Sequence, residues 1–138
     1  GYSVAFDPVD GSSIYPANWS VGTIFGIWPG GQLLGRCGQD QVAAGFSVFG
    51  PRTVIVIARP SGSAGGEPVV EEYTLLGTQW TRTCDHLRIP ANKKTFAPAN
   101  LRAASDNSAY HDLMLAWMAD KYSLRYSGGL VPDVYHIF

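Results

Sequence analysis

The octapeptide FDPVDGSS, residues 6–13, concentrates groups that could bind a metal ion. Asp7 and Asp10 supply two carboxylates three residues apart, and Pro8, with its fixed φ angle, stiffens the chain between them. The carbonyl of Val9 is expected to add a third oxygen ligand on the same side. Because Mg²⁺ binds through a few carboxylates together with phosphate oxygens, this spacing favours a magnesium site that acts on a phosphate.

The last three residues of the octapeptide could bind an anion. Gly11, Ser12 and Ser13 offer successive backbone N–H groups and two hydroxyls, as in an anion-binding nest beside a cation. The alternative is a plain surface turn, because Asp, Pro, Gly and Ser are the residues that turns prefer. The octapeptide alone leaves both interpretations open.

Two other chemistries based on aspartate do not fit the octapeptide. A nucleophile of the haloacid-dehalogenase type needs Asp-x-Asp, whereas Asp10 comes three positions after Asp7. An EF-hand loop that started at Asp7 would need a glutamate at its twelfth position, and that residue is Asn18.

Apolar and β-branched stretches predict the strands that must position the octapeptide. They lie at about residues 3–6, 21–28, 53–59 and 69–76. The near-continuous apolar run 53–59 is typical of a strand covered on both faces. Segment 60–68, rich in Gly, Ser and Pro, is predicted to be the tip of a hairpin between two of these strands.

Two helices are predicted between and after the strands. The first runs from an N-cap at Asp40 to about Phe49, where Gly50 and Pro51 would stop it. The second spans 108–122 and is capped by Asn107 or Ser108. Its apolar face, expected to pack into the core, comprises Tyr110, Leu113, Met114, Trp117 and Met118. Interleaved strands and helices predict an α/β or layered α+β fold.

The composition is that of one packed domain. The 138 residues are 46% hydrophobic and 15% charged, with a formal net charge of −1. This charge argues against nucleic-acid binding, and no apolar run approaches the roughly 20 residues that cross a bilayer. Cys37 and Cys84 lack a metal-binding CxxC spacing and are expected to be buried or incidental thiols. Both ends lie within apolar segments, so we expect the chain to be the interior of a longer protein.

Two long motifs carry a family resemblance. FDPVDGSS, followed by VGTIFGIW at 21–28, resembles the signature of the Mg²⁺-dependent, Li⁺-sensitive sugar bisphosphatases. RYSGGLVPDV, residues 125–134, resembles their second hallmark, and QVAAG at 41–45, followed by Gly50, resembles their helix after the hairpin. The resemblance implies an α/β fold, a layered αβαβα sandwich. Residues 1–59 would form the metal- and phosphate-binding region and residues 69–138 the region that binds the sugar bisphosphate.

The resemblance also implies roles within the octapeptide. Asp7, the carbonyl of Val9 and Asp10 would bind Mg²⁺, with Mn²⁺ as an alternative, and Asp7, Asp10 and Ser12 would be catalytic. The groups holding the reacting phosphate would belong to Gly11, Ser12 and Ser13. The metal would offset developing charge and acidify a water. Further carboxylates would come from outside the chain, so this segment alone is expected to be inactive.

The second motif is expected to bind the far end of the substrate. Arg125 and Tyr126 resemble the pair that reaches the distal phosphate, with the arginine crossing from a neighbouring subunit of a homodimer or homotetramer. The alternative for Arg125 is a surface arginine after a helix. Asn100 and Arg102 resemble contacts to the sugar. Asp133 is expected to cap the closing helix, and the three histidines are assigned no role.

The choice between sugars rests on three short stretches. Ile14 directly after DGSS, GPRT at 50–53 and TFAPANLRA at 95–103 resemble the sedoheptulose-1,7-bisphosphatases more than the fructose-1,6-bisphosphatases. The chain is therefore expected to serve carbohydrate metabolism by hydrolysing the 1-phosphate of sedoheptulose 1,7-bisphosphate. The alternatives are a fructose-1,6- or dual-specificity enzyme, and an inactive regulatory protein that binds sugar phosphates. An intracellular location is expected, with plastid and cytoplasm both open.

Overall fold

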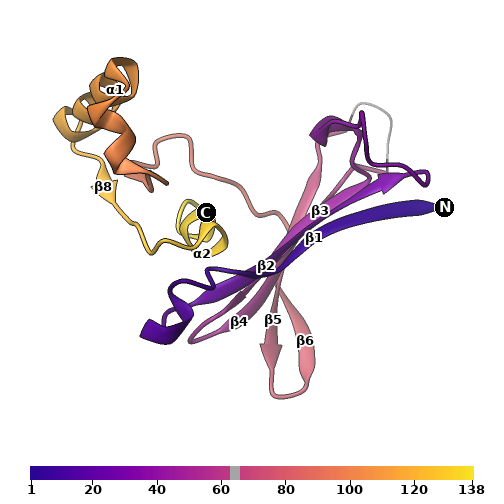
Figure 1. Cartoon of the computed structure of the whole chain (residues 1–138). Coiled ribbons are helices and arrows are strands. Elements are labelled where there is room, and N and C mark those ends of the chain that lie inside the picture. Colours follow the sequence, from indigo (N-terminus) through magenta and orange to yellow (C-terminus); the bar gives the residue numbers. More distant parts are fainter. Residues whose placement is uncertain (63–65) are drawn as a thin grey trace.

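A computed structural model describes residues 1–62 and 66–138, and its main element is a six-stranded sheet (Figure 1). The strands lie side by side in chain order, and every neighbouring pair is antiparallel. They are β1 (Tyr2–Asp10), β2 (Val21–Pro29), β3 (Ala43–Phe49), β4 (Thr53–Arg59), β5 (Val69–Leu76) and β6 (Gln79–Cys84).

The predicted strands at 53–59 and 69–76 are confirmed as β4 and β5. Arg59 pairs with Val69, so the prediction that 60–68 joins two strands of a hairpin is also confirmed, although residues 63–65 lie outside the described residues. The expectation that both faces of β4 are covered is confirmed for one face and only in part for the other. Val54 and Val56 are buried, whereas Ile55 and Ile57, which point to the other face, are half-buried.

The helix predicted over 40–49 is wrong. Only Gly38–Asp40 forms a short 3₁₀ helix (η2), where the Asp40 carboxylate accepts the Cys37 N–H at 3.1 Å, and Ala43–Phe49 is strand β3. Ala44, Phe46 and Val48 alternate along one face of β3, which is hydrogen-bonded to β2 on one side and to β4 on the other. Pairing with two strands outweighs the helix propensity of the QVAA segment.

The rest of the chain adds a second, smaller layer of strands and two helices. β7 (Thr95–Phe96) and β8 (Ser123–Leu124) pair in parallel, and the helices are α1 (Ser108–Ala119) and α2 (Leu130–Tyr135). Two further 3₁₀ helices are η1 (Tyr15–Ala17) and η3 (Leu101–Ser105). Figure 1 shows the large sheet, α2, β8 and α1 following one another across the molecule. This is the order of the last four layers in the expected αβαβα sandwich.

Helix α1 confirms the second predicted helix, though it ends at Ala119. The Asn107 side chain caps it by accepting the Tyr110 N–H at 3.0 Å. Its apolar face is only partly buried, however: Met114 is buried and Trp117 packs on Phe96, with the ring centroids 5.2 Å apart, while Met118 is 58% exposed.

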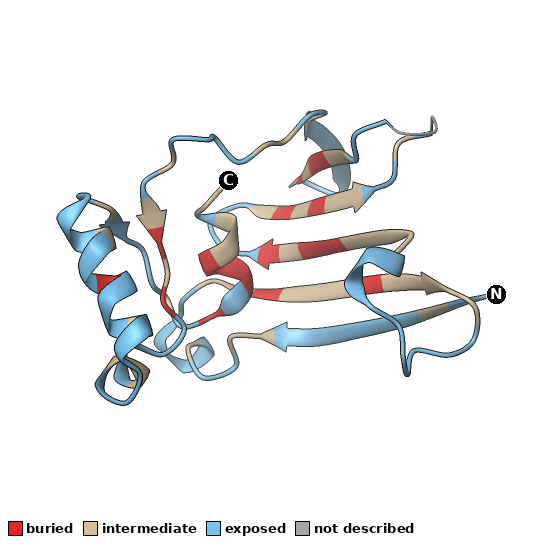
Figure 2. Cartoon of the chain, turned by 90° about the horizontal axis from the view of Figure 1, so that it is seen from above, coloured by how far each residue is buried: buried red, intermediate tan, exposed pale blue. Residues whose placement is uncertain are grey.

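Helix α2 covers the middle of one face of the large sheet and closes the core. Val131 packs there with a cluster of buried sheet residues, Phe46, Val48, Val54 and Val56, and Figure 2 shows the buried residues gathered in these strands and in α2. Gly22 of β2 permits the close approach, since a Cβ at that position would overlap the Val131 side chain. In the parts of the chain that the structure describes, no helix is long and apolar enough to cross a membrane.

Candidate functional site

A β-bulge in β1 brings the two carboxylates of the octapeptide to one face of the sheet. Asp7 pairs with Ile24 and Asp10 pairs with Gly22, so β1 has one residue more than β2 over this interval. In a regular strand, side chains three residues apart point to opposite faces of the sheet. The extra residue of the bulge turns the second side chain to the same face as the first. Asp7 and Asp10 therefore share the face on which α2 lies. The sequence predicted a strand that ended near Phe6, whereas β1 continues to Asp10.

The bulge is held by two local hydrogen bonds. The Val9 N–H donates to Asp7 Oδ1 at 3.1 Å, and the Thr23 hydroxyl donates to the Pro8 carbonyl at 2.8 Å. Thr23 was not singled out from the sequence, because nothing local marks it as the partner of a bulge. Asp7 and Val9 are exposed, so the groups expected to bind metal are open to solvent.

The chain turns sharply at the end of β1. Gly11 has a φ of 89°, and its carbonyl accepts the N–H groups of Ile14 at 3.0 Å and Tyr15 at 3.2 Å. Such a φ angle strains residues other than glycine, and a Cβ here would lie 3.5 Å from the Gly129 Cα. Ser12 and Ser13 follow with exposed hydroxyls, as a phosphate-binding role requires.

Asp10 joins the two sequence motifs directly. Its Oδ2 accepts the Val131 N–H at 2.7 Å and its Oδ1 accepts the Leu130 N–H at 3.3 Å, across 121 and 120 residues respectively. The carboxylate thus meets the N-terminal end of α2, where backbone N–H groups lack partners within the helix. This contact fixes the orientation of a predicted metal ligand.

The loop before α2 is held by Asp133. This buried carboxylate accepts the Ser127 N–H at 2.7 Å and the Gly128 N–H at 3.2 Å. Asp133 was expected to cap the closing helix. It lies within the first turn of α2 and instead ties down the chain that leads into the helix.

Arg125 and Tyr126 lie beside a cavity of about 490 Å³ whose wall also includes Trp19 and His136. The Arg125 guanidinium is exposed and donates only to the neighbouring Leu124 carbonyl, at 3.1 Å, among the described residues. The Tyr126 hydroxyl donates to the Ala99 carbonyl at 3.2 Å. Arg125 is thus placed to meet an anion or a second chain.

The structure does not join Asn100 and Arg102 to the octapeptide. Both side chains are exposed at or near the start of η3, and within residues 1–62 and 66–138 neither makes a hydrogen bond or an ion pair. The hydrogen bond from Tyr126 to Ala99 brings the second motif next to Asn100, but not to its side chain.

The oxygen ligands of the octapeptide fit a hard divalent cation, but they form only part of its coordination shell. Asp7 and Asp10 offer only oxygen, on one face of the sheet, which suits Mg²⁺ better than metals that prefer nitrogen or sulfur. Over the described ranges, no group of three or more His, Cys, Asp or Glu side chains is close enough to hold a metal ion. The remaining ligands would therefore be water, substrate oxygens or residues from elsewhere.

Comparison with known proteins agrees with this arrangement. Residues 1–75 match the family model of the fructose-1-6-bisphosphatase N-terminal domain, and residues 89–138 match that of its C-terminal domain. Chloroplastic sedoheptulose-1,7-bisphosphatase from Spinacia oleracea is 49% identical over 99% of this chain. Fructose-1,6-bisphosphatase class 1 from Citrifermentans bemidjiense is 36% identical over 96% of it. The chain spans 34% and 38% of the lengths of these two relatives.

Solved structures share the fold. A Toxoplasma gondii protein with the provisional name sedoheptulose-1,7 bisphosphatase is 40% identical, with a TM-score of 0.86 over 99% of this chain and 46% of its own. Fructose-1,6-bisphosphatase from Leishmania major in its T-state is 28% identical, with a TM-score of 0.77 over 98% of this chain and 45% of its own. The expected α/β fold is therefore confirmed, and the chain belongs to the fructose-1-6-bisphosphatase family.

Proposed function

We propose that the protein carrying this chain is a metal-dependent sugar bisphosphatase that hydrolyses the 1-phosphate of sedoheptulose 1,7-bisphosphate. The observation that carries this proposal is the junction of the two motifs. The bulge in β1 sets Asp7 and Asp10 on one sheet face, and Asp10 binds the start of α2, directly after the segment that contains Arg125 and Tyr126. The proposed phosphate site and the proposed second anion site would therefore belong to one connected structure.

The residues of this chain would act as follows. The backbone N–H groups of residues 11–13 and the exposed hydroxyls of Ser12 and Ser13 bind the scissile phosphate. Asp7, Asp10 and the Val9 carbonyl hold the cation, for which Mg²⁺ is the expected ion and Mn²⁺ an alternative. When bound, the cation would supply positive charge against the charge that develops on the phosphate and acidify the attacking water.

The distal phosphate would be bound by the second motif. A guanidinium suits a phosphate because it donates two parallel hydrogen bonds, and the Arg125 group is exposed. It lines the cavity of about 490 Å³, and we expect it to act across a subunit boundary in a homodimer or homotetramer. Tyr126 would line the same site, and Asn100 and Arg102 would face the sugar.

The preference for the seven-carbon sugar rests on the relatives. Three chloroplastic proteins named sedoheptulose-1,7-bisphosphatase are 46% to 49% identical to this chain, whereas the class 1 fructose-1,6-bisphosphatases are 34% to 36% identical. A fructose-1,6- or dual-specificity bisphosphatase is the second candidate, since it would use the same octapeptide and the same chemistry.

Steady-state phosphate release tests the proposal. The full-length protein should release phosphate from sedoheptulose 1,7-bisphosphate and, more slowly, from fructose 1,6-bisphosphate. EDTA should abolish both reactions and added Mg²⁺ should restore them. Tight binding of both sugars without phosphate release would instead identify an inactive regulatory protein, and release that is insensitive to EDTA would contradict the metal site.

A further inference from the structure

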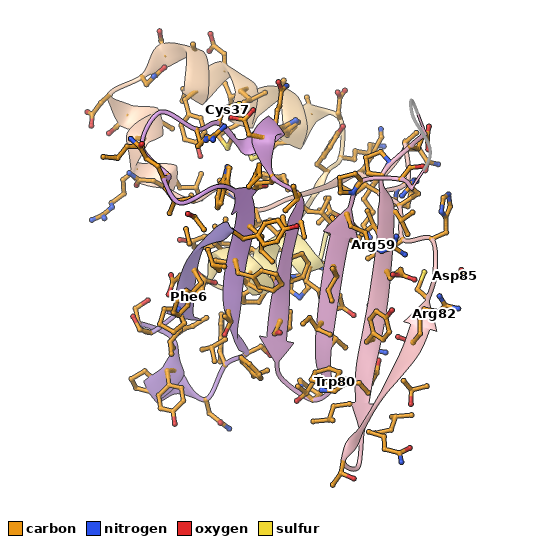
Figure 3. All side chains as sticks on the ribbon, turned by 90° about the vertical axis from the view of Figure 1, so that its right-hand side faces the viewer. Phe6, Cys37, Arg59, Trp80, Arg82 and Asp85 are labelled. Carbon is orange, nitrogen blue, oxygen red and sulfur yellow. The ribbon has the colours of Figure 1, made fainter. Side chains whose placement is uncertain are left out.

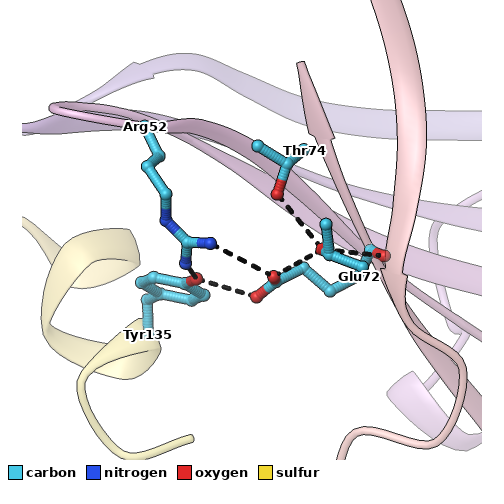
Figure 4. A network of polar contacts seen from close by, with 5 residues as sticks. Arg52, Glu72, Thr74 and Tyr135 are labelled. Atoms are coloured by element: carbon cyan, nitrogen blue, oxygen red, sulfur yellow. Dashed lines mark hydrogen bonds and ion pairs between the residues drawn. The ribbon is translucent and has the colours of Figure 1, made fainter. Parts of the chain in front are cut away.

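A network of polar side chains joins the C-terminal end of α2 to the sheet (Figure 4). Glu72 of β5 is only 8% exposed, and its Oε2 accepts the Tyr135 hydroxyl at 2.7 Å. Its Oε1 accepts the Thr83 hydroxyl at 2.8 Å and lies 3.9 Å from Arg52 Nη1. Arg52 Nη2 also donates to the Tyr135 hydroxyl, at 2.8 Å. Glu72, Tyr135 and Arg52 therefore form a closed triangle of contacts.

The network lies at the opposite end of α2 from the candidate site. Asp10 accepts hydrogen bonds from the first two residues of the helix, and Tyr135 is its last residue. The six residues of α2 span only about 9 Å, so a shift at Tyr135 would be transmitted to Leu130. The Tyr135 ring also packs edge-on against Phe46, with centroids 6.2 Å apart, which leaves it little freedom.

The chemistry of the network favours one arrangement. A buried carboxylate without partners is costly, so Glu72 strongly prefers the position in which both of its oxygens accept hydrogen bonds. Burial, and then the hydrogen bond to Glu72, raise the pKa of Tyr135, so its hydroxyl stays protonated and able to donate at neutral pH.

We propose that Glu72, Tyr135 and Arg52 are positioning residues for the phosphatase reaction, holding α2 so that its first N–H groups meet Asp10. They also fix the position of the loop that carries Arg125 and Tyr126, because this loop leads directly into α2. The hydrogen bonds and ion pair of the three side chains lead to one another and to Thr83, not to the octapeptide, so they act through α2. The proposal rests on the proposed function, which it extends to residues outside both sequence motifs.

The neighbouring residue in β5 provides a matched control. Glu71 is 6% exposed, and it pairs with Arg82 at 2.9 Å and with Arg59 at 3.3 Å. Figure 3 shows Arg59 and Arg82 on the face of the sheet away from α2. The hydrogen bond from Arg82 lowers the pKa of Glu71, which burial opposes, so the Glu71 side chain is charged at neutral pH. Glu71→Gln and Glu72→Gln thus each replace a carboxyl group by an amide of similar size, at adjacent and similarly buried positions on opposite faces.

The experiment compares Glu72→Gln, Tyr135→Phe and Glu71→Gln in the full-length protein. Hydrogen exchange of the amides at residues 127–131 is measured by mass spectrometry, together with kcat, KM for the sugar bisphosphate and the Mg²⁺ concentration for half-maximal rate. Glu72→Gln and Tyr135→Phe should speed exchange about tenfold, as expected when a hydrogen bond to a charged group is lost. They should also raise KM and the Mg²⁺ requirement several-fold. Glu71→Gln should leave all of these unchanged.

Each outcome bears on the proposal. If Glu72→Gln lowers the melting temperature as Glu71→Gln does but leaves exchange at 127–131 unaltered, the network only stabilises the fold and the proposal is wrong. Tyr135→Phe keeps the ring and its packing, so it tests the same point if Glu72→Gln does not fold. If the wild-type protein has no phosphatase activity, the proposed function fails, and exchange alone decides whether the network holds α2.

Discussion

Asp10 has two tasks in this structure. Its carboxylate accepts two N–H groups of α2, and it is the proposed metal ligand on the same sheet face as Asp7. Only the second task requires a full negative charge, because an amide oxygen can also accept an N–H. The two tasks can therefore be separated by a substitution that keeps the shape of the side chain.

Asp10→Asn in the full-length protein should abolish turnover while the fold is retained. The Asn oxygen can still accept the Val131 N–H, but the charge that holds the cation is lost. Phosphate release at saturating Mg²⁺ measures the first effect, and near-ultraviolet circular dichroism checks the second. A variant with near-normal kcat would contradict the metal assignment.

Arg125→Ala should raise KM strongly and kcat less. A contact to the distal phosphate is made equally in the ground state and in the transition state, so its loss weakens binding more than chemistry. A sugar monophosphate without the distal group is the control, and its KM should hardly change. Equal losses for both substrates would mean that Arg125 has a structural role.

At the scale of the elements, the close packing of α2 on β2 depends on a glycine in β2, which has no side chain. Gly22 lies under Val131, and a Cβ there would also approach the Ser47 carbonyl. The core has no space for it, because α2 is already seated on the buried cluster around Val54.

Gly22→Ala should therefore destabilise the protein by about 1–3 kcal/mol, as overpacking does in other cores. Urea unfolding of the full-length protein measures the change. Gly31→Ala is the matched control, because a Cβ at Gly31 would meet nothing within 4 Å, and it should leave the midpoint almost unchanged. Similar midpoints for the two variants would show that α2 can shift without cost.

At the scale of the whole molecule, the predicted preference for the seven-carbon sugar lies outside the octapeptide. Ile14, Asn100 and Arg102 are the positions that resemble the sedoheptulose type. A seven-carbon substrate has one more hydroxylated carbon, and a group that binds a hydroxyl discriminates strongly against a substrate that lacks it. We expect a higher kcat/KM for sedoheptulose 1,7-bisphosphate than for fructose 1,6-bisphosphate.

Replacing Asn100 and Arg102 by residues of the fructose type should narrow this difference without changing the Mg²⁺ requirement. The exposed side chains of both residues make the substitutions safe for folding. Equal or reversed preference in the wild-type protein would favour the dual-specificity alternative.

Features set by residues close together in the sequence could be predicted, whereas features set by residues far apart in the sequence could not. β4 and β5 were predicted because their apolar residues are continuous in sequence. β3 was predicted as a helix, because its first residues favour helices and its strand form depends on β2 and β4. The contact of Asp10 with Val131 and that of Glu72 with Tyr135 join residues 121 and 63 positions apart, and no local pattern marks them. In the sequence, only the two adjacent glutamates within the apolar run of β5 point to the network, and they do not reveal their partners.

The distance along the chain between Asp10 and Val131 also has a consequence for biosynthesis. At about 5–20 residues per second, a ribosome needs roughly 6–24 s to add the 121 residues that lead from Asp10 to Val131. The strands of the large sheet follow one another in sequence and can pair as they leave the ribosome. Asp10 can bind α2 only after that helix has been synthesised. A product truncated before residue 130 would carry the octapeptide without the helix that orients Asp10. The candidate site is thus completed only after Val131 has been translated.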